Sequence, residues 1–167
     1  KEFDEEWLYA LKKEYYPLLA RADAPSQAAR MITLEGFSMK PVVFEHDTTS
    51  DVYFIGNRTG YTGVYRKSLK EKDPEASATN IIQGERTDEF EAFHPFRTRM
   101  DISRLGILAL STKSGEHDAV HLFDIVENDL VETFHFSQLV SIGSTSWATD
   151  GKRLAFTAID KAGNNDL

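Results

Sequence analysis

The sequence contains no cysteine among its 167 residues, and this absence excludes disulfide bonds and thiolate catalysis within the chain. It also contains no run of about 18 apolar residues, so we expect no direct insertion into a membrane. Basic residues are outnumbered, because 19 lysines and arginines stand against 27 aspartates and glutamates, which gives a net charge of −8. Since binding to phosphate groups needs clustered basic residues, this balance argues against nucleic acid as a partner.

Sequence motifs of catalysis are missing as well. The zinc motif His-Glu-x-x-His does not occur, and neither does the Gly-x-Ser-x-Gly motif of serine hydrolases. The glycines between positions 56 and 63 have no phosphate-binding lysine beside them and no helical pattern after them. We therefore predict that the chain is not itself an enzyme and that it has no catalytic residue and no cofactor.

Metal-binding patterns are also missing. The sequence contains five histidines: His46, His94, His117, His121 and His135. The third and fourth are four residues apart, but on a strand this spacing separates them by about 13 Å, too far for one metal ion. We expect a structural or surface role for each histidine. The oxygen-rich segment 160–166 lacks the ligand order of a calcium loop, so we favour a solvated hairpin there over a calcium site.

Residues 1–33 differ from the rest of the chain and predict a helical leader. Apolar residues recur there at helical spacing, at Phe3, Trp7, Leu8, Leu11 and Tyr15. We expect Pro17 to end or bend this helix, since proline lacks the amide donor. The pair Pro25-Ser26 is typical of the start of a short second helix through Met31. The leader is interpreted either as a cap on a β-domain or as the tail of a preceding domain.

From Thr33 onward, short apolar runs alternate with turn residues, which is typical of β-strands. We expect three units, at about residues 34–84, 90–139 and 140–167. The expected strands are 41–44, 52–55, 63–65 and 80–83 in the first unit, 104–111, 119–126 and 130–136 in the second, and 143–148 and 153–159 in the third. Four strands joined by short turns form one blade of a β-propeller in outline.

A recurring motif supports the division into units. Its clearest copy runs from Asp150 to Ala158, a second runs from Asp101 to Ala109, and a more degenerate copy occurs earlier. Aligning Val52, Leu105 and Leu154 gives a period of roughly 50 residues, in the range of propeller blades. The sequence thus predicts a mainly β fold, an incomplete β-propeller of about two and a half four-stranded blades preceded by a short α-helical segment. A β-sandwich would have similar strands without this repeated turn.

The segment 146–156, Ser-Trp-Ala-Thr-Asp-Gly-Lys-Arg-Leu-Ala-Phe, resembles a repeat of the TolB-like β-propeller family. The family's usual form is Pro-x-Trp-Ser-Pro-Asp-Gly-x-x-Ile-Ala-Phe, and Ala148 and Thr149 replace the Ser-Pro pair here. The resemblance covers residues 34–167 and implies a periplasmic or otherwise extracytoplasmic location. We interpret Asp150 and Gly151 as a structural turn, in which glycine accepts a positive φ and aspartate bonds nearby backbone amides.

The leader carries a second resemblance. Its segments 3–7 and 12–19 are similar to the C-terminal helix of a metallopeptidase-like domain, which precedes TolB-like repeats in some bacterial proteins. This resemblance implies that the catalytic unit either lay upstream and was lost or is absent. Because the sequence starts at Lys1 and shows no signal peptide, we expect a processed or excised piece of a longer protein.

One basic and aromatic stretch stands out near the start of the second unit. It contains Phe93, His94, Phe96, Arg97 and Arg99, which are the candidate partner-binding residues. Cationic and aromatic side chains in this arrangement suit the binding of an acidic peptide or glycan at a propeller face. The alternative interpretation is a connection between blades whose charges lie in solvent.

Two functions are consistent with these patterns. The favoured one is a non-catalytic, extracytoplasmic scaffold that binds a protein or peptide. The alternative is an accessory propeller of a hydrolase, with a metallopeptidase domain before it or a prolyl-oligopeptidase-like domain after it. Because an incomplete array leaves sheet edges open, we expect another copy, a partner chain or the rest of the same chain to complete the propeller.

Overall fold

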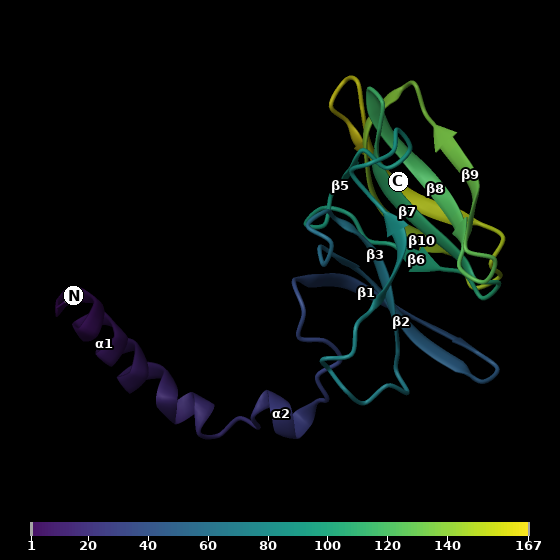
Figure 1. The fold of residues 1–167 in the computed structure, drawn as a ribbon. Helices are drawn as coiled ribbons and strands as arrows, with labels where there is room; N and C mark the ends of the chain where they lie inside the picture. The colour runs from purple at the N-terminus through teal and green to yellow at the C-terminus, as the bar shows by residue number, and fades with distance from the viewer. Residues whose placement is uncertain (1, 167) are drawn as a thin grey trace. The chain divides into compact units, whose positions relative to one another are not determined.

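The computed structural model describes residues 2–166 and shows a mainly β protein, with 44% of residues in strands and 13% in helices. The chain divides after Ile32 into a helical unit and a β unit that begins at Thr33 (Figure 1). The β unit contains three antiparallel sheets, and none of them is closed within the described residues. The predictions of a mainly β fold and of a short α-helical segment before it are confirmed.

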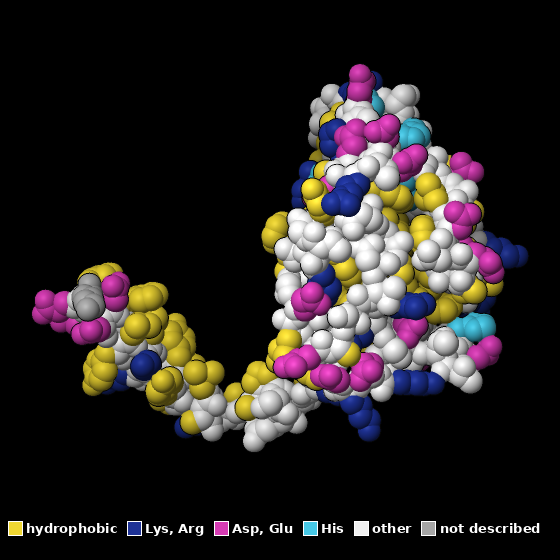
Figure 2. Space-filling model, in the orientation of Figure 1, with side chains coloured by type: hydrophobic (Ala, Val, Ile, Leu, Met, Phe, Trp, Pro, Cys, Tyr) yellow, Lys and Arg dark blue, Asp and Glu magenta, His cyan; other side chains and the backbone are white. Residues whose placement is uncertain are grey.

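The first helix, α1 (Glu2–Leu19), continues past Pro17 rather than ending there. Proline removes only its own amide donor, and the amide of Ala20 still donates to the carbonyl of Tyr16 at 2.8 Å, which closes the last turn. No residue of α1 is buried, and apolar side chains lie along its visible side in Figure 2, with acidic side chains at its N-terminal end. This acidic first turn suits the positive end of the helix dipole.

The second helix, α2 (Pro25–Ala28), is shorter than the sequence suggests. It stops before Met31 because Ala29 has extended backbone angles, with φ −146° and ψ 155°. Neither helix of the described chain combines the length and the apolar character needed to cross a membrane.

The strands of each sheet follow one another in space in nearly the order of the chain (Figure 1). The first sheet consists of β1 (Ser38–His46), β2 (Thr49–Gly56), β3 (Gly63–Ser68) and β4 (Thr79–Gln83). The second consists of β5 (Ala92–Phe93), β6 (Asp101–Ile102), β7 (Ile107–Ser114), β8 (His117–Asp124) and β9 (Asp129–His135). The third consists of β10 (Leu139–Trp147), β11 (Leu154–Asp160) and β12 (Asn165–Asp166). Every strand expected from the sequence overlaps one of these.

One edge of the second sheet is split into two short strands. β5 pairs with Thr112 and Lys113, and β6 pairs with Leu108 and Ala109, on the edge of β7 that does not face β8. The intervening segment 94–100 leaves the sheet and then returns to it. Strands of two residues show no alternation of side chains, so the sequence pattern did not reveal them. The split exposes most of the basic and aromatic stretch at the surface.

The main hydrophobic core lies between the first and second sheets. It is formed by side chains at most 8% exposed, namely Tyr53, Ile55, Val64, Ile82, Phe90, Phe93, Met100, Leu108, Leu110, Phe123 and Ile125. Because successive residues of a strand point to opposite faces, Val52 and Phe54 lie on the other side of the first sheet. The two sheets therefore pack face to face, and each depends on the other to remove its apolar face from water.

The opposite face of the first sheet is covered by the unit's own connections. Phe54 and Tyr65 stack there with their ring centres 6.1 Å apart, and the Arg58 guanidinium lies 4.5 Å from the centre of the Phe54 ring. Arg58 also donates to the Thr33 hydroxyl at 2.9 Å, while its Nε lies 3.6 Å from the Glu35 carboxylate, at ion-pair rather than hydrogen-bond distance. Desolvation lowers the pKa of Arg58 below its usual value.

A second cation holds the connection between β3 and β4, residues 69–78, over the same face. Lys67 is 4% exposed, and its ammonium donates to the carbonyls of Asp73 at 2.8 Å, Pro74 at 3.3 Å and Ala76 at 2.5 Å. Three acceptors match the three donors of the ammonium group. We call residues 69–78 the lid, because this buried lysine ties them over the sheet.

The turns that precede β7 and β11 contact each other. Gly106 and Gly151 have positive φ angles, 81° and 68°, and a Cβ atom at Gly151 would lie 3.8 Å from the side chains of Ser103 and Leu105. Nearby, the Thr145 hydroxyl on β10 lies 2.9 Å from the carbonyl oxygen of Ala109 on β7 and donates to it. The third sheet is therefore attached to the second both through its turn and through its strands.

The repeat alignment does not join structurally equivalent residues. Val52 lies within β2, Leu105 lies in the turn before β7, and Leu154 is the first residue of β11. The phase differs because the connections between strands have unequal lengths, such as the lid within the first unit. The motif indicates repeated turns, whereas the strand pairing shows which residues of the units occupy equivalent positions.

Substitution of Lys67 by methionine is expected to lower the free energy of unfolding by about 2 kcal/mol. Methionine keeps the apolar stem, whereas the lid carbonyls lose their buried donor. Chemical denaturation measures the loss, and hydrogen exchange should accelerate within the lid. Lys72→Met, at an exposed position of the lid, is the control and is expected to lower the free energy of unfolding by less than about 0.5 kcal/mol. Equal stability of the two variants would contradict the role assigned to Lys67.

Candidate functional site

Four of the five candidate partner-binding residues line one groove of the β unit. Its volume is about 660 Å³, and its lining residues are Phe37, Met39, Thr62, Phe93, His94, Pro95, Phe96 and Arg97. The first sheet provides one wall from the residues around the starts of β1 and β3, and segment 94–97 provides the other. Arg99 lies outside this lining. We call this depression the groove.

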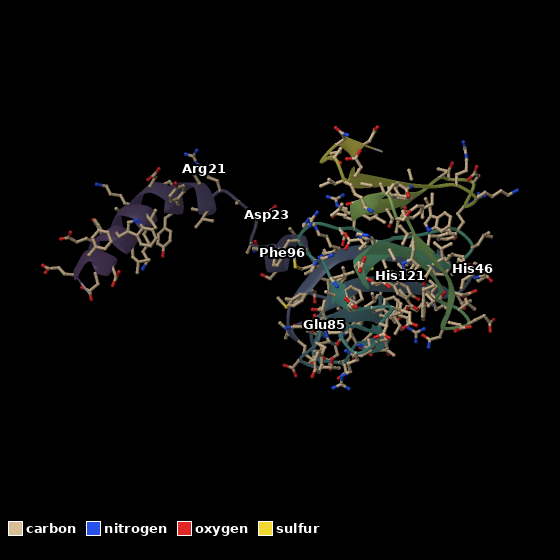
Figure 3. The ribbon with its side chains drawn as sticks, turned by 90° about the horizontal axis from the view of Figure 1, so that it is seen from above. Arg21, Asp23, His46, Glu85, Phe96 and His121 are labelled. Atoms are coloured by element: carbon tan, nitrogen blue, oxygen red, sulfur yellow. The ribbon has the colours of Figure 1, made fainter. Side chains whose placement is uncertain are left out.

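The two phenylalanines of the groove have different surroundings. Phe93 is 7% exposed and belongs to the core between the sheets, so it supports the groove from below rather than projecting toward a partner. Phe96 is 81% exposed. In Figure 3 it lies at the periphery of the β unit, whereas His121 lies among the strands. A large aromatic ring kept in water beside a groove is a feature of binding surfaces.

His94 fixes the wall that carries Phe96. Its Nε2 atom lies 3.0 Å from Oδ1 of Asp118, a side chain that is 8% exposed. The second oxygen of this carboxylate accepts the amide of Ile142 at 2.8 Å. The carbonyl of His94 accepts the amides of Arg97 and Thr98, both at 2.9 Å, which forms a turn. The wall is thereby attached to β8 and, through Asp118, to β10.

Three cations surround this end of the β unit. Arg97 donates to the Ser141 hydroxyl at 2.7 Å. Arg99 and Lys40 line a neighbouring depression of about 220 Å³, which we call the cationic depression. The side chains of Arg99 and Lys40 form no hydrogen bond or ion pair with another described residue. Positive charge is therefore present here without a paired carboxylate.

The carboxylates nearest in the chain are already engaged. Glu91 pairs with Lys113, whose hydrogen bond is the main cause of the lowered pKa of Glu91. One oxygen of Asp101 accepts the amide of Trp147 at 2.7 Å. Both oxygens of Asp118 are bonded as described above. None of these carboxylates pairs with Lys40, Arg97 or Arg99, so the three cations have no ion-pair partner among the described residues, although the whole chain has a net charge of −8.

Asp150 and Gly151 lie in the turn between β10 and β11. The carboxylate of Asp150 accepts the amide of Lys152 at 2.9 Å and Nε of Arg153 at 3.1 Å. The bond from the Lys152 amide is the largest cause of the lowered pKa of Asp150. With both oxygens occupied and Gly151 at positive φ, the pair acts in the geometry of the turn.

The oxygen-rich segment after β11 is likewise a closed turn. Asp160 accepts the amides of Ala162 and Asn164 at 2.8 Å and the side-chain amide of Asn164 at 2.9 Å. The side-chain bond from Asn164 is the largest cause of the lowered pKa of Asp160. Within residues 2–166, no group of three histidine or acidic side chains is arranged to hold a metal ion.

His121 is a buried structural residue with both ring nitrogens bonded. Its Nε2 lies 2.8 Å from the Thr112 hydroxyl, and its Nδ1 lies 3.1 Å from the Thr133 hydroxyl. Thr112 also bonds the carbonyl of Glu89 at 3.2 Å, so this hydroxyl donates to the carbonyl and accepts from Nε2–H. Desolvation, with a smaller effect of His135, lowers the pKa of His121 to about 4. The imidazole is therefore neutral at pH 7.

The sequence pattern did not reveal the half of the site that the first sheet contributes. Phe37, Met39 and Thr62 belong to this half of the groove, and Lys40 belongs to the cationic depression. Their only local signal is the alternation of apolar residues before Pro41. Their position opposite segment 94–97 follows from the stacking of two sheets, a long-range contact that no short motif encodes.

Alanine substitutions should separate the core residue of the groove from the surface residue. Phe93→Ala is expected to lower the free energy of unfolding by about 3–5 kcal/mol, because it leaves a cavity between two sheets. Phe96→Ala is expected to change it by less than about 0.5 kcal/mol, because the ring is already in water. Urea denaturation of both variants measures the difference. Similar losses for the two would contradict this assignment.

Acidification is expected to destabilise the β unit through His121. An unfolded histidine titrates near about 6.5, whereas folded His121 titrates at about 4, so the unfolded state binds more protons between these pH values. The contribution of neutral His121 to the free energy of unfolding is complete above pH ~6.5. It falls as the pH drops toward ~4, by at most about 1.4 kcal/mol per pH unit. Denaturation midpoints across this range should vary less for His121→Gln than for the native chain. An unchanged profile for His121→Gln would refute the assignment.

No protein-family model matches this chain, and a search of curated proteins gives no match either. The comparisons therefore assign no family. The resemblance to TolB-like repeats depends on the residues of segment 146–156 and on the spacing of the repeated turns.

Proposed function

We propose that residues 34–167 are part of a TolB-like β-propeller that acts as a non-catalytic scaffold outside the cytoplasm and binds a protein or peptide. The order of the sheets supports the architectural part, because each unit forms its own antiparallel sheet with neighbouring strands paired. Packing supports it too. The first sheet shares its core with the second, and the Ser111 hydroxyl of the second donates to the carbonyl of Gly143 in the third at 2.9 Å. The location is inferred from the resemblance alone.

The observation that carries the binding part is the groove with its exposed Phe96 and its cations. Tryptophan, tyrosine and arginine dominate the energetics of protein interfaces, because they combine a large apolar area with hydrogen-bonding groups. Phe96 and Arg97 offer the same combination on a wall that His94 and Asp118 hold in place. A wall fixed before binding loses little conformational entropy when a partner arrives.

Selection from a random peptide library displayed on phage tests this proposal. The native chain, immobilised, is expected to enrich peptides, and the double variant Phe96→Ala/Arg97→Ala is expected to lose that enrichment. The matched control is Val131→Ala/Lys161→Ala, which removes an exposed apolar residue and an exposed cation elsewhere on the β unit. It should behave as the native chain does. No enrichment by the native chain, or enrichment that survives loss of Phe96 and Arg97, would refute the proposed site.

A further inference from the structure

We infer that the groove and the cationic depression together bind an acidic peptide, with an aromatic or large aliphatic side chain in the groove and flanking carboxylates on Lys40, Arg97 and Arg99. This inference rests on the proposed function and names its ligand class. Neighbouring residues of the chain line the two depressions, since Met39 of the groove precedes Lys40 and Arg97 lies two residues before Arg99. A short extended segment is the kind of ligand that reaches both.

The groove offers an apolar surface of suitable size. Its volume of about 660 Å³ lies within the range of about 300–1,000 Å³ that is typical of ligand sites. Phe37, Met39, Phe93, Pro95 and Phe96 supply most of its lining. An aromatic side chain from a partner would remove the exposed ring of Phe96 from water and lose its own hydration at the same time.

The charged side chains around the groove favour a negatively charged ligand. Arg99 and Lys40 form no ion pair with a described residue, and the bond of Arg97 to Ser141 is to a neutral hydroxyl. Exchanging this hydroxyl for a carboxylate gives a bond between two charged groups, and the guanidinium can bind a carboxylate through two donors. A ligand carboxylate is thus favoured over the contact that Arg97 makes at present.

The charge of the rest of the chain limits the length of the anion. Three cations stand within a chain of net charge −8, so a long polyanion would meet repulsion beyond this end of the molecule. A peptide with a few carboxylates placed near its apolar residue avoids that repulsion. This argument favours a peptide over a sulfated glycan or a nucleic acid.

Fluorescence anisotropy with three short fluorescein-labelled peptides tests the inference. One peptide has a central tryptophan between glutamates, the second has a central alanine between glutamates, and the third has a central tryptophan between lysines. The first is expected to bind about tenfold or more tightly than either of the others, because each control lacks one of the two interactions. Its affinity should fall as salt is raised, since the ion pairs are at the surface.

Variants of the same chain locate the binding. Arg97→Gln/Arg99→Gln and Lys40→Gln are each expected to weaken binding of the glutamate–tryptophan peptide, the double variant by about tenfold or more. Lys152→Gln, which removes an exposed cation from the turn between β10 and β11, is the control and should bind as the native chain does. Circular dichroism of each variant confirms that the fold is retained.

The outcomes distinguish this inference from the proposed function. Phage selection that enriches neutral or basic peptides in a Phe96-dependent manner would overturn the acidic ligand and leave the binding scaffold standing, whereas no selection at all would remove both. Tighter binding of a labelled heparin oligosaccharide than of the acidic peptide would overturn the inference in favour of a glycan. Self-association of the chain that depends on Arg97, measured by sedimentation without peptide, would instead assign the groove to a second copy.

Discussion

The buried carboxylate of Asp118 connects three parts of the β unit. It projects from β8, pairs with His94 in the segment between β5 and β6, and accepts the amide of Ile142 in β10. A carboxylate that is largely removed from water is tolerated only when its oxygens are bonded, and a charged acceptor gives stronger bonds than a neutral one. The wall of the groove and the attachment of the third sheet therefore depend on the same side chain. The side chain that holds the wall of the groove thus also joins the second sheet to the third.

Much of the strand pattern could be read from the sequence, because alternating apolar residues bounded by turn residues have a local physical cause. Segment 94–97 could also be recognised, since cations and aromatic rings close together are conspicuous. Phe93 was grouped with the binding residues, yet it is a core residue, because β5 is too short to show alternation. Met39 and Lys40 were not predicted, since they reach the site only when the first sheet stacks on the second. Short-range patterns set the elements, while the site is set by residues more than thirty positions apart in the chain.

The net charge of the sequence is a poor guide to the charge of the site. Several acidic side chains make local interactions. They lie at the first turn of α1, in the turns of Asp150 and Asp160 and in the pair of Glu91 with Lys113. Each of these carboxylates interacts with nearby amides, a helix end or a cation. Lys40, Arg97 and Arg99 have no such carboxylate partner among the described residues. A chain with an excess of acidic residues thus presents three cations without an ion-pair partner at one end of its β unit.

The lid has a consequence for the synthesis of the chain. The groups that cover the outer face of the first sheet, namely Thr33, Arg58, Lys67 and residues 69–78, are all in or next to that sheet in the sequence. They leave the ribosome together with β1 to β4, before any residue of the second sheet. N-terminal segments fold first during translation, and exposed apolar faces are the ones that aggregate. The nascent first sheet therefore exposes one apolar face instead of two. This face stays exposed until Phe93 and Leu108 have been synthesised and cover it.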